Sequence, residues 1–313
     1  MKTLFPPLMR LALKISLSLT LVASVTYSVR ADTPSSTQIA NISSRVLCET
    51  QDAVTVTEFA VRGPGTEYFI LRALGPSLAQ FGVPGVLKNP TLTLLDARGR
   101  VIDFNDNWVD SPDKDAIIAT GIPPTDDRES AIVQTLSRGI YTSVVRGVHN
   151  GTGIDLSEVY RLSSSDEATL ITSIGTRGFV STGDNVLISG FIVTGTDPFP
   201  MLIRVLGPSL TSAGIPGALA DPVLELHNAN GDIIASNDNW RDTQEAEIIA
   251  TGLPPENDLE SALVVALSPG AYTVVVRGLG DTEGIGFVQY YSLDIRGQAL
   301  GPQLNPAPII RRL

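Results

Sequence analysis

Short runs of alternating apolar and polar residues dominate the chain. Val54–Val61 and Val223–His227 both alternate with a period of two, which is typical of strands with one buried face. Gly-containing turn signals at Ala97–Arg100 and Ala229–Asp232 separate such runs and predict hairpins. Ala271–Arg277 is rich in β-branched residues and predicts a core strand. Strands therefore follow turns roughly every 8–12 residues, which predicts an all-β fold.

A long internal repeat organises this pattern. Residues 74–78 read Leu-Gly-Pro-Ser-Leu and return 132 positions later as residues 206–210. The two copies are identical at 19 of 35 positions over residues 74–108, and at 21 of 31 positions over residues 117–147. A unit of about 125 residues has the size of a domain and is much longer than a solenoid repeat.

The repeat divides the chain into segments. We expect two tandem antiparallel β-sandwich domains of jelly-roll type that arose from an internal duplication. The expected segments are a signal peptide (1–31), a linker (32–39), a first repeat (40–164), a linker (165–169), a second repeat (170–296) and a loose C-terminal tail (297–313). Within each repeat, only the segment that begins at Asp115 and its copy favour a short helix.

The N-terminus has the features of a secretory leader. Positive charges at Lys2, Arg10 and Lys14 precede or enter the apolar stretch Ile15–Val25, and small or aliphatic residues flank a cleavage position after Ala31. The apolar stretch is short for a membrane span, although an uncleaved anchor is the alternative. We therefore expect a protein that is secreted or held at the cell surface and has no membrane partner after signal cleavage.

The composition narrows the class of partner. The chain has 22 Lys and Arg against 33 Asp and Glu, a formal charge of -11, and no basic run. Phosphate groups would be repelled, so nucleic acid is excluded as an expected partner. With 43% hydrophobic and 18% charged residues the chain is globular, and 28 Gly and 21 Pro suit a turn-rich β protein. The single cysteine, Cys48, forms no intrachain disulfide and is expected to be a small buried apolar residue.

The order of elements from Leu224 to Leu293 supports a family resemblance. A strand, an Asn-Gly turn, Ile-Ala-Ser-Asn-Asp, an apolar strand, Pro-Gly-Ala-Tyr-Thr-Val-Val-Val and a glycine turn follow one another. This order resembles the bacterial pre-peptidase C-terminal domains, which are β-sandwich modules of secreted hydrolases, and the similar collagen-binding modules of collagenases. With residues 176–179 and 206–210, the unit also resembles tandem repeats of exported bacterial proteins without an assigned function. The resemblance implies an exported, non-catalytic accessory or surface module, sometimes with bound calcium.

A polar loop that ends in tryptophan is repeated and could bind calcium. Calcium takes six to eight oxygen ligands at about 2.3–2.6 Å, so several loops would have to converge. The alternative is that Asn and Asp close the turn through their own backbone, and we favour this interpretation. The candidate ligands are Asn105, Asp106, Asn107, Asp127 and Glu129 in the first repeat, and Asn237, Asp238, Asn239, Asp258 and Glu260 in the second.

The pair Glu-Ser is a second repeated motif. Glu129 and Glu260 each follow a Pro-Pro turn and precede an apolar strand. Such a glutamate could be a cation ligand, an acceptor for loop N–H groups, or the partner of a partly buried arginine. Of these we favour an ion pair with Arg146 and Arg277, respectively.

The two tryptophans, Trp108 and Trp240, end the two polar loops. They could be platforms that stack on sugar rings or on side chains of a partner. A tryptophan beside a hairpin also commonly closes the end of a sandwich core, and we favour this second interpretation.

Enzyme motifs are absent from the sequence. The Gly-Pro-Ser sequences at Gly75 and Gly207 lack the second glycine of a nucleophile elbow, and no His-Glu-x-x-His or Walker loop occurs. A glycosidase with two carboxylates would need unlike walls around a cleft, which duplicated small sandwiches seldom provide. We therefore expect no catalysis.

Three functions are compatible with these features. The first is an exported pair of non-catalytic binding modules for an extracellular polysaccharide or protein, in which calcium could stabilise the fold. The second is a purely structural component of a cell surface or matrix, and the third, which is weak, is a secreted hydrolase. Exposed tryptophans would favour the first function, and buried tryptophans the second.

Overall fold

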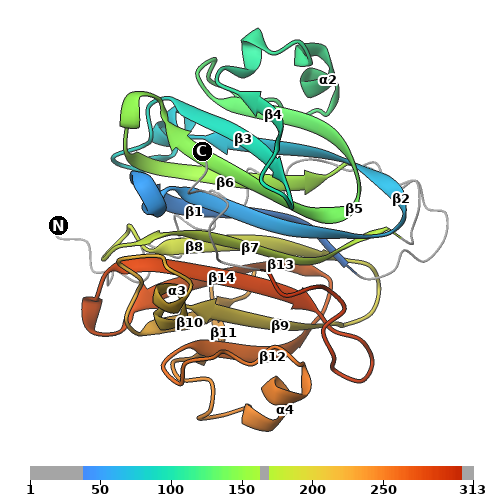
Figure 1. The fold of residues 1–313 in the computed structure, drawn as a ribbon, viewed down its shortest axis with the longest axis vertical. Helices are drawn as coiled ribbons and strands as arrows, with labels where there is room; N and C mark the ends of the chain where they lie inside the picture. The colour runs from blue at the N-terminus through green and yellow to red at the C-terminus, as the bar shows by residue number, and fades with distance from the viewer. Residues whose placement is uncertain (1–37, 163–168, 305–313) are drawn as a thin grey trace.

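The computed structural model describes residues 38–162 and 169–304. The predicted all-β fold is confirmed (Figure 1). The strands of the first repeat are β1 (Gln38–Cys48), β2 (Thr55–Leu74), β3 (Pro90–Asp96), β4 (Val101–Asn105), β5 (Ser130–Gly147) and β6 (Gly153–Arg161). Those of the second are β7 (Leu170–Val180), β8 (Leu187–Thr194), β9 (Phe199–Leu206), β10 (Pro222–His227), β11 (Ile233–Asn237), β12 (Ser261–Leu267), β13 (Gly270–Gly278) and β14 (Gly284–Ser292).

Helical elements are short. The expected helices form as α2 (Lys114–Ala119) and α4 (Glu245–Ala250). A further helix is α3 (Pro208–Ser212), and the 3₁₀ turns are η1 (Gln51–Ala53), η2 (Pro76–Phe81), η3 (Trp108–Asp110), η4 (Val148–Asn150) and η5 (Leu279–Asp281). No helix in the described ranges is long and apolar enough to cross a membrane. The expected signal peptide and its cleavage position lie outside the described residues.

Two long strands of the first repeat each contribute one part to each of two layers. The first part of β2, Thr55–Val61, pairs with the second part of β5, while Thr66–Ala73 pairs with the first part of β5. The register shift between Val61 and Thr66 separates the two parts. In the second repeat the same positions form separate strands, with β8 and β9 in place of β2, and β12 and β13 in place of β5.

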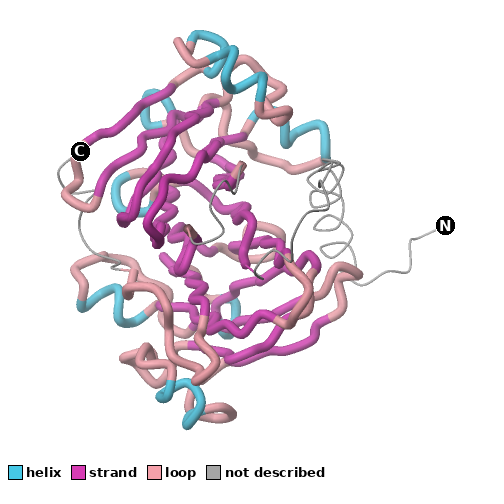
Figure 2. The backbone as a smooth tube through the Cα atoms, turned by 90° about the vertical axis from the view of Figure 1, so that its right-hand side faces the viewer, coloured by secondary structure: helices cyan, strands magenta, loops and turns pink. Residues whose placement is uncertain are grey.

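The strands build two facing layers (Figure 2). One layer has the order β4-β3-β5-β2-β7-β14-β9-β12, and the other has the order β11-β10-β13-β8-β1-β6-β2-β5. Aromatic side chains meet between the layers, with the ring centroids of Phe191 and Tyr290 5.0 Å apart. Hydroxyls also meet there, with 2.8 Å between Ser44 Oγ and Thr176 Oγ1. Each layer therefore contains strands from both repeats, and the two repeats share one apolar core between the layers.

Two long strand pairings cross the boundary between the repeats, besides a single residue pair of β1 and β7. β1 pairs antiparallel with β8, where Arg45 lies opposite Ile188. β2 pairs antiparallel with β7, where Val56 lies opposite Arg177. The partners in the second pairing are the partners in the first shifted by 132 positions in the sequence. The prediction of two separate tandem domains is therefore not confirmed, because the sheets are continuous across the boundary.

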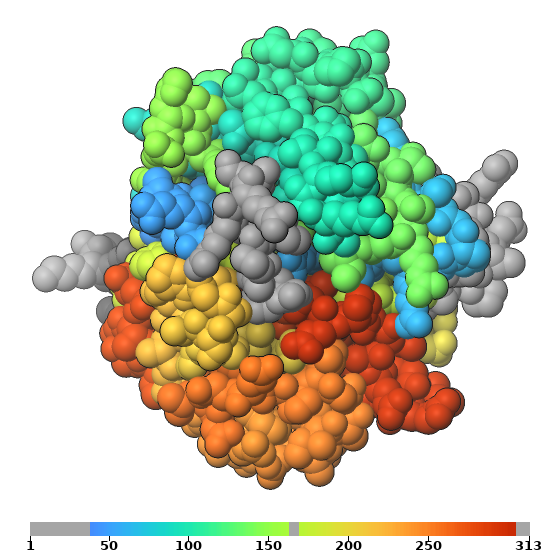
Figure 3. Space-filling model, viewed as in Figure 1, coloured from blue at the N-terminus to red at the C-terminus, as the bar shows by residue number. Residues whose placement is uncertain are grey.

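A pseudo-twofold axis relates the two repeats. Leu47 of β1 lies opposite Phe179 of β7, and these positions are equivalent in the two copies. The repeats consequently lie one above the other around β1, β7 and β8, with α2 and α4 at opposite ends (Figure 1). The space-filling view shows close contact between the two halves (Figure 3).

The C-terminal segment is bound as far as Leu304. Ala299 N–H donates to Thr251 O at 3.1 Å, and Leu300 N–H donates to Ser292 O at 2.8 Å. The Leu304 side chain is completely buried. The prediction of a loose tail is therefore wrong for residues 297–304, while residues 305–313 lie outside the described chain.

Because the repeats share their sheets, we expect them to unfold together. Trp108→Phe leaves a fluorophore in the second repeat alone, and Trp240→Phe leaves one in the first. Urea unfolding followed by fluorescence should give coincident midpoints in the two variants, as two-state behaviour requires. Two separated midpoints would contradict shared sheets.

A proline substitution in a strand that pairs across the repeat boundary is a second test of whether the repeats unfold together. Ser189→Pro in β8 should destabilise both repeats by about 3 kcal/mol or more, since it interrupts a central strand. Ser236→Pro, on the edge strand β11, is the matched control and should have a smaller effect.

Candidate functional site

The repeated motifs meet around one buried glutamate in each repeat. Glu260 Oε1 accepts hydrogen bonds from Gly207 N at 2.9 Å, from Ser209 N at 3.0 Å and from Ser209 Oγ at 2.5 Å. Its Oε2 accepts from Asn257 N at 3.4 Å. The glutamate is completely buried, and its carboxylate therefore ties the Gly-Pro-Ser turn to the loop before β12.

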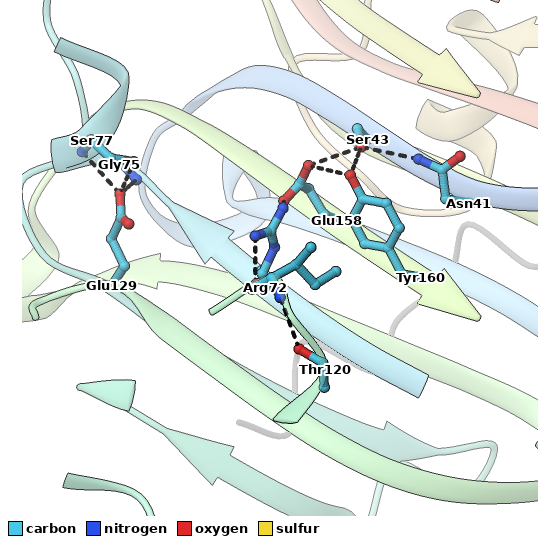
Figure 4. Close-up of polar contacts among 10 residues, drawn as sticks. Asn41, Ser43, Arg72, Gly75, Ser77, Thr120, Glu129, Glu158 and Tyr160 are labelled. Carbon is cyan, nitrogen blue, oxygen red and sulfur yellow. Dashed lines mark hydrogen bonds and ion pairs between the residues drawn. The ribbon is translucent and has the colours of Figure 1, made fainter. Parts of the chain in front are cut away.

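The first repeat has the same arrangement (Figure 4). Glu129 Oε1 accepts from Gly75 N at 3.0 Å, from Ser77 N at 2.9 Å and from Ser77 Oγ at 2.5 Å. Hydrogen bonds to a charged acceptor are stronger than bonds between neutral groups, so this contact is suited to holding a loop. Among the interpretations of the Glu-Ser motif, the geometry matches the acceptor for loop N–H groups.

Close backbone packing explains the glycine of the Gly-Pro-Ser turn. A Cβ atom on Gly207 would lie 2.3 Å from Leu219 O, and one on Gly75 would lie 2.1 Å from Leu87 O. No side chain fits at these distances, so only glycine allows the turn to approach the following loop.

The first asparagine of the polar loop bridges two backbone groups. Asn237 Oδ1 accepts from Ala262 N of β12 at 2.9 Å, and its Nδ2 donates to Asn239 O at 3.0 Å. Asn105 makes the equivalent bonds to Ala131 N at 3.0 Å and to Asn107 O at 3.2 Å. Both amides are therefore occupied in holding the loop against the edge of a sheet.

Both tryptophans belong to the core. Trp240 is 2% exposed, and its N–H and Nε1–H donate to Glu260 O at 2.9 Å and to Asn257 O at 3.2 Å. Trp108 is 9% exposed and makes the equivalent bonds. A stacking platform requires an open ring face, whereas the indoles lie among apolar residues of the cores.

The favoured ion pair between the glutamates and Arg146 or Arg277 is wrong. Arg277 Nε lies 3.8 Å from Glu225 Oε2 of β10, whereas Glu260 lies in the loop before β12. Of the other candidate ligands, Asp258 is exposed and pairs with Arg241 at 2.6 Å, and Asp127 is exposed. The loops therefore do not bring the five candidate ligands of either repeat to one point.

Two other carboxyl groups each have one oxygen atom without a hydrogen-bond partner among the described residues. The Oδ1 atoms of Asp238 and Asp221 are buried and have no hydrogen-bond partner in the described part of the chain. Burial raises the pKa of Asp221, and the neighbouring Asp238 carboxylate raises it further. The equivalent atoms in the first repeat, Asp106 Oδ1 and Asn89 Oδ1, are in the same condition.

Sequence reasoning identified Asp106 and Asp238 but missed Asn89 and Asp221. The available signal was the repeat itself, because both missed residues precede a proline at equivalent positions. Paired oxygen ligands of this kind suit a hard cation such as calcium. The described residues contain no group of three or more His, Cys, Asp or Glu side chains that could hold a metal ion. A bound cation would therefore need backbone carbonyls or water as further ligands.

Two further carboxyl groups are buried in the first repeat. Burial raises the pKa of Asp155 to about 8, although Thr55 Oγ1 donates to it at 2.7 Å. Burial also raises the pKa of Glu58 to about 8, against the lowering effect of the Arg177 charge. The second repeat has glycine at both equivalent positions.

Comparisons with known proteins identify no family. No family model matches the chain, and no curated protein matches it. A solved structure entitled "Structure of PNGF-II in C2 space group" aligns with a TM-score of 0.21 and 11% identity, over 85% of this chain and 58% of that chain. The chain thus spans less than two thirds of that protein. The resemblance to pre-peptidase C-terminal domains stays a prediction.

Removal of the buried carboxylate should destabilise the protein. Glu260→Ala leaves three N–H groups and one hydroxyl without their acceptor, which should cost about 3–5 kcal/mol of unfolding free energy. Urea denaturation followed by circular dichroism measures the loss. Glu256→Ala, at an exposed position nearby, is the control and should stay within about 0.5 kcal/mol of the wild type. Equal stability of the two variants would contradict the role of Glu260.

Proposed function

We propose that the protein is an exported structural component of a bacterial cell surface or extracellular matrix. In this function the repeat pair is a stiff spacer and performs no catalysis. The N-terminal leader supports export, and the acidic composition disfavours anionic membranes and nucleic acids as partners.

One observation carries this proposal. The polar groups that recur in both repeats are directed inwards, since the Glu260 carboxylate and the Asn237 amide bind backbone N–H groups and the Trp240 ring lies in the core. Residues repeated for ligand binding would present these groups to solvent. Their use within the fold, together with sheets that cross the repeat boundary, favours a structural function over a pair of binding modules.

The location and function can be tested in the producing cells. Intact cells treated with protease should lose the protein, and its mature N-terminus should be Asp32. Deletion of the gene should weaken the cohesion of the surface layer or matrix. Wild-type protein should restore this cohesion, and the destabilised Glu260→Ala variant should not. Retention in the cytoplasm with an intact leader would refute the proposal.

We propose further that calcium stabilises the fold at Asp221 and Asp238, and at Asn89 and Asp106. The support is the four buried oxygen atoms that have no hydrogen-bond donor. A cation that binds only the folded state adds RT ln(1 + [L]/Kd) to the unfolding free energy, which is about 1.4 kcal/mol at tenfold excess over Kd.

Calcium should therefore raise the melting temperature of the mature protein. The double variant Asp106→Asn with Asp238→Asn should lose most of this increase, whereas Asp258→Asn, at an exposed position outside the pair, should retain it. Melting followed by circular dichroism at 0 and millimolar calcium provides the measurement. An unchanged melting temperature in the wild type would exclude the calcium site.

A further inference from the structure

The second repeat binds a segment of its own chain on its outer face. Ser173 Oγ donates to Pro302 O at 3.2 Å, and Gln289 Nε2 donates to Leu304 O at 3.3 Å. Leu304 N–H donates to the Tyr291 hydroxyl at 3.1 Å. Side chains on β7 and β14 thus hold the backbone of residues 302–304, which is the contact that an extended peptide ligand would make.

The Leu304 side chain completes an apolar cluster. It packs in a cluster that contains Leu202, Trp240 and Ile248. The first repeat has Ile70, Trp108 and Ile117 at the equivalent positions, again in one cluster. The described members of that cluster include none from a segment equivalent to Pro302–Leu304.

The residues that hold the segment also have counterparts in the first repeat. Asn41 of β1 corresponds to Ser173, while Glu158 and Tyr160 of β6 correspond to Gln289 and Tyr291. Figure 4 shows that these three counterparts lie together with Ser43 and Arg72.

Hydrogen bonds within this group leave one acceptor unused. Glu158 Oε1 accepts from Ser43 Oγ and from the Tyr160 hydroxyl, both at 3.0 Å, and Glu158 Oε2 lies 2.5 Å from Arg72 NH2. Asn41 is 3% exposed, and its Oδ1 has no hydrogen-bond partner in the described chain. A buried acceptor without a donor is costly, so this oxygen indicates that a donor is supplied from elsewhere.

The chemistry of the group matches a peptide backbone. An asparagine amide can accept from one backbone N–H and donate to a backbone carbonyl. The Tyr160 hydroxyl donates to Glu158 and keeps lone pairs that can accept an N–H, as Tyr291 does from Leu304. Ser43 is half-buried and replaces Gly175, which adds a hydroxyl that the second repeat lacks.

We propose that Asn41, Ser43 and Tyr160 form a peptide-binding site for an extended Pro-x-aliphatic segment of a partner protein. The segment Pro302–Leu304 of the chain itself is bound in the second repeat and is not free to bind the first, and we assign the ligand of the first repeat to another protein. This site goes beyond the proposed structural function, because it gives the spacer a specific point of attachment.

A labelled peptide tests the site on the full mature protein. The probe is a fluorescent peptide with the sequence of residues 299–313, which contains Pro302 and Leu304. Fluorescence anisotropy should show saturable binding of one peptide per chain. A peptide with serine at both of these positions should bind at least about tenfold more weakly, since it loses the apolar contacts.

Variants of the protein locate the binding. Asn41→Ala and Tyr160→Phe should each weaken binding about three- to tenfold, because each removes one hydrogen-bonding group. Ser173→Ala, the matched change in the second repeat, should leave the affinity unchanged. Circular dichroism checks that each variant is folded. If Tyr160→Phe does not fold, the comparison of the two peptides on the wild-type protein still tests the site.

Three outcomes would overturn the proposal. They are the absence of binding at millimolar peptide, equal affinity of Asn41→Ala and wild type, and a loss of binding caused by Ser173→Ala. The surface location and the effect of gene deletion are measured separately, so failure of the peptide test would leave the structural function standing.

Discussion

Strand pairing across the repeat boundary is the constraint on which the rest of the structure depends. β1 of the first repeat pairs with β8 of the second, and β7 pairs in return with β2. Each facing layer therefore takes strands from both copies, and the apolar core between the layers belongs to both. Without this pairing across the boundary, two strands in each repeat would have an unpaired backbone edge, and such edges promote aggregation. The pseudo-twofold arrangement removes four such edges from the surface.

The repeated motifs are explained by their contacts with one another. Glu260 binds the backbone of the Gly-Pro-Ser turn, and its own carbonyl accepts the N–H of Trp240. Asn237 fixes the start of the same loop to β12. Removal of the Glu260 or Asn237 side chain leaves buried polar groups without partners, which costs about 1–3 kcal/mol for each group. Similarity between the two copies at these positions therefore follows from stability alone, and it does not require chemistry on a substrate.

The sequence predicted the individual strands well, but it did not predict which strands and side chains contact one another. Alternation identifies the buried face of Val223–His227, and β-branched residues mark β13, because these signals act over a few residues. In Val54–Val61 the same signal predicts the strand but not its environment, since both faces are buried. Alternation does not identify the neighbouring strand, so it could not distinguish pairing within a repeat from pairing across the boundary. The contact between Glu129 and Gly75 joins segments 54 positions apart, and nothing in either segment specifies the other. Asn89 and Asp221 were overlooked for the same reason, since each becomes notable only beside Asp106 or Asp238.

Strand pairing across the repeat boundary also limits how the gene can change. Unequal recombination between the two copies would remove about 132 codons and leave a single unit whose β1 and β2 edges have lost their partners. Such a unit could complete its layers only with a second polypeptide.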